Sequence, residues 1–251
     1  KEIHESEFFL QEGDMLVLMS DGVTNAGIGK LQPDGWPRQE VAAFLEGWAD
    51  CSAQRMAAQL VNACTSLCLE SPDDDITAVV FHVRQRRAAS VLIGPPARSE
   101  DDEKICRIFF SKEGAHVICG GSTAQMAARY LNQTVIPLPD TQTAEIPACA
   151  SLEGVDLVTE GIVTLRALTE LAERYALDNS LSLDIHKGQD GVARLARLLF
   201  EEVTDINLFF GQAVNHAHDL LDIDFSQKTA LIKRLSQALT DMGKNVKISL
   251  C

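Results

Sequence analysis

The sequence lacks any long hydrophobic run. In its 251 residues no apolar segment approaches the roughly 20 residues that a transmembrane helix needs. The residues from Lys1 to Glu7 are mostly charged and no uninterrupted apolar segment follows them, so a signal peptide is not indicated. We therefore expect a cytoplasmic protein. The absence of an initiating Met also favours a piece of a longer chain.

Basic residues are scarce. The chain has 22 Lys and Arg against 36 Asp and Glu, which gives a net charge of −14. Such a surface repels phosphate backbones and anionic lipids, so we expect neither nucleic-acid nor membrane binding as the main task. The acid is concentrated in residues 1–85, with 14 acidic and 5 basic residues. That imbalance suits a cation site.

Several common binding motifs are missing. The seven cysteines form no C-x-x-C pair, so a zinc knuckle is not supported, and free buried thiols in a reducing compartment are expected. The chain also has neither the Gly-Lys-Ser/Thr of a phosphate-binding P-loop nor the G-x-G-x-x-G of a dinucleotide fold. Any anion site must therefore be of another kind.

The pattern of elements changes at the basic run Arg84 to Arg87, which divides the chain into predicted domains 1–86 and 88–251. In the first domain, the sequence predicts a hairpin from Glu2–Leu10 into Met15–Ser20, followed by a Gly-rich loop. Two helices and a final strand should then span residues 38–49, 52–69 and 76–83.

Carboxylates stand at the ends of two apolar strands of this domain. Asp21 follows one strand, with Gly22 beside it, and Asp74 shortly precedes the other. If these strands are neighbours, both carboxylates can converge on one point, where their hard oxygen ligands suit Mg²⁺ or Mn²⁺. Either group alone could equally be an ordinary turn or a solvated loop.

The motifs Ser-Asp-Gly at Ser20 and Asp-Asp-x-Thr at Asp74, in that order, resemble the C-terminal half of a metal-dependent (type 2C) protein serine/threonine phosphatase. Within it, residues 1–85 are most similar to the sporulation stage II protein E branch. The resemblance implies that Asp21 and Asp74 bind catalytic metals. Asp75 occupies a neighbouring position of open role. It also implies an α+β fold, part of a β-sandwich with flanking helices.

The chemistry implied by the resemblance is hydrolysis of phosphoserine or phosphothreonine through a two-metal centre of Mn²⁺ or Mg²⁺. Its substrate would be a phosphorylated regulatory protein in a bacterial signalling pathway, such as an anti-sigma-factor antagonist. The family's N-terminal Asp-Gly motif, whose Asp bridges both metals, is not in this sequence. We therefore expect an incomplete catalytic domain with little activity by itself.

The second domain alternates strands and helices, which predicts an α/β fold with a mostly parallel sheet and helices on both faces. The order of the two domains also resembles that branch, because some of its phosphatases carry a C-terminal α/β extension. The predicted strands lie near residues 90–94, 115–119, 133–137, 154–159, 206–210 and 245–250.

Ligands of such sheets bind at the C-terminal ends of the strands. There, Gly120, Gly121, Ser122 and Thr123 open a predicted helix, and their backbone N–H groups and hydroxyls suit a phosphate or carboxylate. A tight turn with a helix cap explains them equally well. The run from Cys119 also resembles, over about a dozen residues, the phosphate-binding turn of sugar-phosphate isomerase-like sensor domains.

Two other strand ends hold candidate ligand-binding residues, Glu160 and His218. Glu160 could instead be a first-turn helix acid, and His218, with His216, an ordinary loop residue. The sequence thus predicts a phosphatase segment joined to a regulatory domain that binds a small anionic ligand. The alternative is that the α/β domain is the functional unit, as a ligand-binding or sugar-phosphate enzyme module, with residues 1–85 as a relic. A homodimer is left open.

Overall fold

The computed structural model describes residues 5–177, 185–213 and 225–251. It divides into two compact units, Lys1–Gln85 and Arg86–Cys251, so the division falls inside the basic run noted above. In the described part of the chain, no helix is both long and apolar enough to cross a bilayer.

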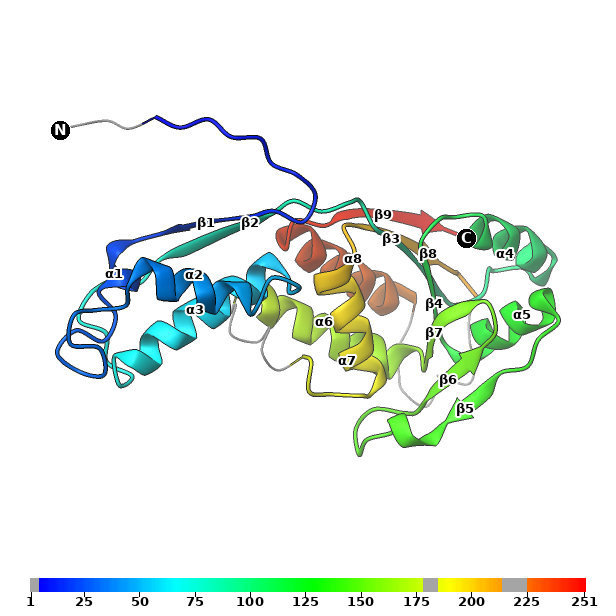
Figure 1. Ribbon diagram of the computed structural model, residues 1–251. Coiled ribbons are helices and arrows are strands. Elements are labelled where there is room, and N and C mark those ends of the chain that lie inside the picture. Colours follow the sequence, from blue (N-terminus) through cyan, green and yellow to red (C-terminus); the bar gives the residue numbers. More distant parts are fainter. Residues whose placement is uncertain (1–4, 178–184, 214–224) are drawn as a thin grey trace. The chain divides into compact units, whose positions relative to one another are not determined.

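The first unit is a two-stranded ribbon with helices along one face (Figure 1). Ser52 caps the longest helix, because its hydroxyl accepts a hydrogen bond from the Arg55 N–H at 3.2 Å. The elements, in chain order, are β1 (Met15–Met19), α1 (Asp21–Thr24), α2 (Arg38–Glu46), α3 (Ala53–Leu67) and β2 (Ala78–His82).

The two faces of the ribbon differ sharply. β1 and β2 pair antiparallel, with Met19 opposite Ala78. Val17 and Ala78 pack against a core that includes Leu60 of α3. On the other face Leu18, Val79 and Phe81 are exposed. Only one face of this ribbon is therefore covered within the unit.

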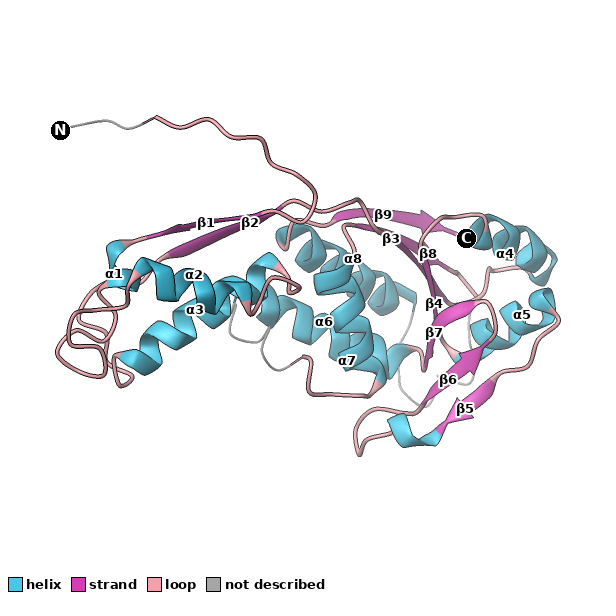
Figure 2. Cartoon of the chain, in the orientation of Figure 1, coloured by secondary structure: helices cyan, strands magenta, loops and turns pink. Residues whose placement is uncertain are grey.

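The predicted hairpin between Glu2–Leu10 and Met15–Ser20 is wrong. Residues 5–10 form no strand (Figure 2), and β1 pairs instead with β2, far along the chain. The aromatic side chains of Phe8 and Phe9 are exposed. Pairing with β2 brings apolar side chains of both strands onto α2 and α3, and that burial outweighs a local turn.

The second unit contains a seven-stranded sheet of order β5-β6-β7-β4-β3-β8-β9. Its strands are β3 (Ala88–Ile93), β4 (Ala115–Cys119), β5 (Ile136–Leu138), β6 (Cys149–Leu152), β7 (Val155–Thr159), β8 (Asp205–Phe210) and β9 (Asn245–Leu250). Its α-helices are α4 (Asp102–Phe110), α5 (Gly121–Leu131), α6 (Ile162–Leu177), α7 (Gly191–Ala196) and α8 (Phe225–Asp241), and α7 runs on into a π-helical turn over Arg197–Glu202.

The predicted mostly parallel sheet is confirmed. β7, β4, β3, β8 and β9 are all parallel, whereas β5 and β6 are antiparallel. From β3 the chain builds one half of the sheet, which contains β4 to β7. It then returns and places β8 on the other side of β3. The order of the sheet therefore reverses between β3 and β8, and sheets of this kind bind ligands at such a point.

Helices cover both faces of this sheet, as predicted (Figure 1). Alternate residues of a central strand enter opposite cores, because successive side chains of a strand point to opposite faces. Leu208 and Phe210 join the core formed with α6, α7 and α8, whereas Phe209 joins the core formed with α4 and α5. The result is a three-layer unit.

One local prediction in this unit needs correction. The strand expected at 133–137 is a short antiparallel edge strand, β5, where Pro137 is tolerated, and its partner β6 was not predicted. β6 reads Cys-Ala-Ser-Leu, a weak strand signal.

Candidate functional site

Ser20 joins the ends of the two strands in the first unit. Its hydroxyl donates a hydrogen bond to the Asp75 carbonyl at 3.1 Å and accepts one from the Thr77 N–H at 3.0 Å. Its own N–H donates to the Thr77 carbonyl at 3.0 Å. The Ser-Asp-Gly and Asp-Asp-x-Thr motifs, distant in sequence, are thereby held next to one another.

Gly22 is required at this corner by close packing. A Cβ atom at this position would lie 2.4 Å from the Asp75 carbonyl oxygen, closer than any side chain can approach. Gly22 is also buried, whereas Asp21 before it and Asp75 opposite it are exposed. The absent side chain therefore lets α1 approach the loop that carries Asp74 and Asp75.

The aspartates in and next to the two motifs have different surroundings. Asp73 is paired with Lys30, with 2.9 Å between Oδ2 and Nζ. Asp74 accepts a hydrogen bond from the Asp75 N–H at 2.8 Å. The carboxylate of Asp21, at the first position of α1, makes no hydrogen bond or ion pair with the described residues. Asp21 and Asp74 thus have carboxylate oxygen atoms without a partner among the described residues.

The donor chemistry at this corner fits a hard divalent cation, but the donors are few. Asp73 and Asp74 line two neighbouring pockets, of about 530 and 730 Å³ including their open mouths, and Asp21 lines neither. Among residues 5–177, 185–213 and 225–251, no three His, Cys, Asp or Glu side chains are grouped to hold a metal ion. The described residues at this corner therefore do not form a complete metal site.

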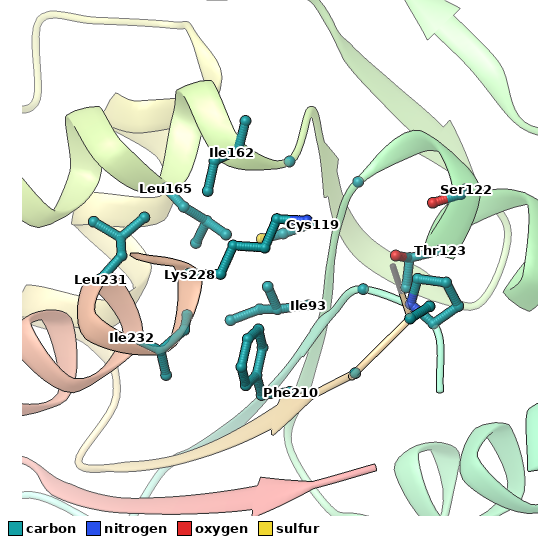
Figure 3. A pocket seen from close by; sticks show the side chains of 16 residues that line it. Ile93, Cys119, Ser122, Thr123, Ile162, Leu165, Phe210, Lys228, Leu231 and Ile232 are labelled. Atoms are coloured by element: carbon teal, nitrogen blue, oxygen red, sulfur yellow. The ribbon is translucent and has the colours of Figure 1, made fainter. Parts of the chain in front are cut away.

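A second candidate site lies in the α/β unit, at the C-terminal ends of its parallel strands. A pocket with about 570 Å³ of empty space, including its mouth, opens at the reversal point between β3 and β8 (Figure 3). A glycine follows each of four strands here, and all four glycines line the pocket: Gly94 after β3, Gly120 after β4, Gly161 after β7 and Gly211 after β8.

The predicted Gly-Gly-Ser-Thr turn lies at this pocket. Gly120, Ser122 and Thr123 line it, whereas Gly121 is exposed just outside. Gly120 has φ +120°, and a Cβ atom there would lie 3.1 Å from Oγ1 of Thr123. Both constraints favour glycine. Thr123 is fully buried, and its hydroxyl has no hydrogen-bond partner among the described residues.

The other two predicted ligand-binding residues do not join them. The carboxylate of Glu160 accepts a hydrogen bond from the Val163 N–H at 3.2 Å, so it caps α6 rather than lining the pocket. His218, like His216, lies outside the described residues.

Sequence reasoning missed Lys228, which lines the pocket from the first turn of α8. The Gly120–Thr123 turn of the same pocket is more than a hundred residues earlier in the chain, so no local motif links Lys228 to it. The glycines Gly94 and Gly211, each directly after a buried strand, were a usable signal. They are the counterparts of Gly120 on the two strands that flank the reversal point.

Cys119 forms part of the pocket wall, but its chemistry is not that of a nucleophile. Burial raises the pKa of its thiol to about 12, so the thiol stays protonated at neutral pH. All seven cysteines are free, and five of them are buried, as the sequence predicts. The pocket therefore offers binding groups rather than a thiolate.

Comparison with known proteins points to a phosphatase-related domain in the first unit alone. The family model described as Stage II sporulation protein E matches residues 1–84, about a third of the chain. No curated protein and no solved structure matches the sequence. The α/β unit lies outside the family match.

Proposed function

We propose that residues 1–85 belong to a metal-dependent protein serine/threonine phosphatase. The observation that carries the proposal is the corner held by Ser20, which joins two motifs that are distant in sequence. The match of residues 1–84 to the Stage II sporulation protein E family supports the same reading.

In this proposal Asp21 and Asp74 hold Mn²⁺ or Mg²⁺, of which the complete domain would bind two ions. When bound, such ions lower the pKa of a water molecule and neutralise phosphoryl oxygens. Asp21 lies on a short helix after a half-buried strand, and Asp74 on a loop fixed by Ser20. The backbone that carries both residues is thereby fixed before a cation arrives. The small donor set predicts weak metal binding by these residues alone.

The proposed substrate is a phosphoserine or phosphothreonine of a regulatory protein, because an exposed corner can accept a protein chain. The aspartates of this corner are exposed, and the pockets beside them are open. We place the protein in the bacterial cytoplasm. The seven free cysteines support a reducing compartment.

The first test is Mn²⁺ binding by the complete chain, measured by isothermal titration calorimetry. Asp21→Asn and Asp74→Asn should each weaken binding by about tenfold or more, because each removes a charged ligand. Asp73→Asn is the matched control and should bind as the wild type does, since Asp73 is already paired with Lys30.

The second test is Mn²⁺-dependent release of phosphate from a phosphoserine protein. The release should disappear in Asp21→Asn and persist in Asp73→Asn. If Asp21→Asn and Asp74→Asn bind Mn²⁺ as tightly as the wild type, or if activity survives Asp21→Asn, the metal assignment is wrong.

A further inference from the structure

We propose that the pocket at the strand ends of the α/β unit binds a small anion with a phosphate or carboxylate head and a short apolar body. The proposal concerns residues outside the family match and does not depend on the metal corner. It rests on an unpaired buried hydroxyl, a single cation, the first turns of three helices and an apolar wall.

The hydroxyl of Thr123 is the strongest indication of a ligand. A buried hydroxyl without a partner is costly, so native proteins rarely keep one unless something else satisfies it. Thr123 is fully buried, and its Oγ1 has no partner in the part of the chain that the structure describes; Figure 3 shows this oxygen pointing toward the interior of the pocket. A ligand oxygen placed there would accept its hydrogen bond.

The groups around Thr123 indicate that the ligand oxygen is anionic. α5 begins at Gly121, and the first N–H groups of a helix have no partner within it and carry its positive dipole end. Gly120, the N-cap residue, offers no side chain to cap them. The hydroxyl of Ser122 lines the same pocket. Together these donors can surround a phosphate or carboxylate.

The charge of the pocket agrees with an anion although the chain as a whole is acidic. Lys228 is the single charged residue among the described residues that line it, and no carboxylate does. In Figure 3 the side chain of Lys228 extends across the pocket toward Cys119. The nearby carboxylate of Glu160 is engaged in capping α6. Among the described residues of the lining, an anion would therefore meet one positive charge and no negative one.

The remaining wall determines the body of the ligand. Side chains from β3, β8, α6 and α8 make this part apolar, and the residues are Ile93, Phe210, Ile162, Leu165, Leu231 and Ile232. A pocket that combines a few convergent polar groups with such a wall selects a ligand with one charged end and one apolar end. A fully hydroxylated ligand would leave polar groups unpaired against this wall.

The experiment is a calorimetric titration of the complete chain with four probes in the presence of EDTA, which removes metal-dependent binding at the aspartate corner. The probes are monobutyl phosphate, butyrate, inorganic phosphate and butylammonium. Monobutyl phosphate or butyrate should bind. Inorganic phosphate should bind at least about tenfold more weakly, because it lacks the apolar body, and the cation butylammonium should not bind. The better of the first two identifies the head group.

Thr123→Val and Lys228→Met test the two side chains that are proposed to bind the anionic head, a hydroxyl and an ammonium group. Each should weaken binding of the preferred probe by about tenfold or more, through loss of a hydrogen bond to a charged group or of the cation itself. Thr123→Val should not lower the melting temperature of the ligand-free protein, because it removes an unsatisfied buried hydroxyl and keeps the shape of the side chain.

Two further variants separate binding from folding. Thr164→Val is the matched control: Thr164 is also fully buried with an unpaired hydroxyl, but it does not line the pocket, so binding should be unchanged. Gly121→Asp has room for its side chain and puts a negative charge at the start of α5. It should abolish binding of the anion while leaving the helix intact.

The proposal is overturned if neither butyl probe binds at millimolar concentration. It is also overturned if Thr123→Val and Thr164→Val lower the affinity equally, or if butylammonium binds as well as the anions. Loss of Mn²⁺ binding in the aspartate variants, or its persistence, has no bearing on these outcomes.

Discussion

The two units of this chain bury their β-structure in different ways. In the α/β unit, helices cover both faces of the sheet and two separate cores result. In the first unit, helices cover one face of the β1–β2 ribbon, and Leu18, Val79 and Phe81 stay exposed on the other. The comparison shows that similar apolar strands can end in different environments, because the layers around them decide which face is buried.

The largest expected effect is from Phe109→Ala in the α/β unit. Phe109 is fully buried between α4 and the sheet, with ring centroids 5.8 Å from Phe209 and 5.0 Å from His116. Truncation leaves a cavity and should cost about 3–5 kcal/mol of unfolding free energy. Chemical denaturation followed by far-UV circular dichroism measures this loss.

Tryptophan fluorescence provides the control for Phe109→Ala, because both tryptophans, Trp36 and Trp48, lie in the first unit. If the units unfold independently, the fluorescence transition should not move. A fluorescence transition that shifts together with the dichroism would show that the two units unfold as one.

The next expected effect depends on pH and concerns Asp205 at the start of β8. Hydrogen bonds from Arg86, and then from Thr204 and Asn245, hold the pKa of this carboxyl well below its usual value. A carboxyl with a lowered pKa in the folded state contributes stability above its unfolded pKa of about 4, and that contribution is lost as pH falls further. Asp205→Asn should therefore lower the melting temperature at pH 7.

The difference between Asp205→Asn and the wild type should shrink as the pH is lowered below about 4, because the unfolded wild type then binds a proton that the folded carboxyl does not, which favours unfolding of the wild type. Melting curves recorded from pH 7 to pH 3 measure this. Asp140→Asn, at an exposed position, is the control and should show no such trend. A constant difference at every pH would contradict the assigned role of the charge.

A smaller effect is expected from the ion pair between α6 and α8. Arg234 donates two hydrogen bonds to Glu173, both at 2.7 Å, and both side chains are substantially exposed. Solvent screens such a pair, so we expect about 0.2–1 kcal/mol of coupling. A double-mutant cycle of Glu173→Gln and Arg234→Gln measures it, and a coupling that is unchanged in high salt would be inconsistent with this account.

The smallest effect should come from the exposed face of the ribbon. Leu18 is 53% exposed, so Leu18→Thr should change the unfolding free energy by less than about 0.5 kcal/mol. Its neighbour Val17 packs against the core on the other face, and Val17→Thr should cost more because it places a hydroxyl there. Tryptophan fluorescence during denaturation measures both. Equal costs would mean that both faces of the ribbon are covered.

Much of the α/β unit could be predicted from the sequence because its signals are local. Apolar runs such as Ser90–Gly94 and Ala115–Cys119 are bounded by glycines, and the helices between them have periodic apolar faces. β6 has no such signal, and its position depends on the neighbouring strand β7. The pairing of β1 with β2 is likewise set by tertiary burial, so the local hairpin was preferred in error.

The candidate sites show the same difference between local signals, which the sequence displays, and tertiary contacts, which it does not. Asp21, Asp74 and Gly120–Thr123 belong to short motifs that the sequence displays directly. The hydrogen bonds of Ser20 and the contribution of Lys228 depend on segments that meet only after folding. Glu160 shows that position in the sequence is not enough to identify a ligand-binding residue. It follows a strand at the edge where ligands bind, but its carboxylate caps α6.

The seven free cysteines have a practical consequence for measuring the motions of this protein. Cys64 and Cys68 lie in the core of the first unit, Cys106 lies on the buried side of α4, and Cys119 lies at the pocket. A thiol-modifying reagent can reach a buried cysteine only while its surroundings are open. The modification rate of each thiol, followed by mass spectrometry, therefore gives the opening frequency of each region in a single time course.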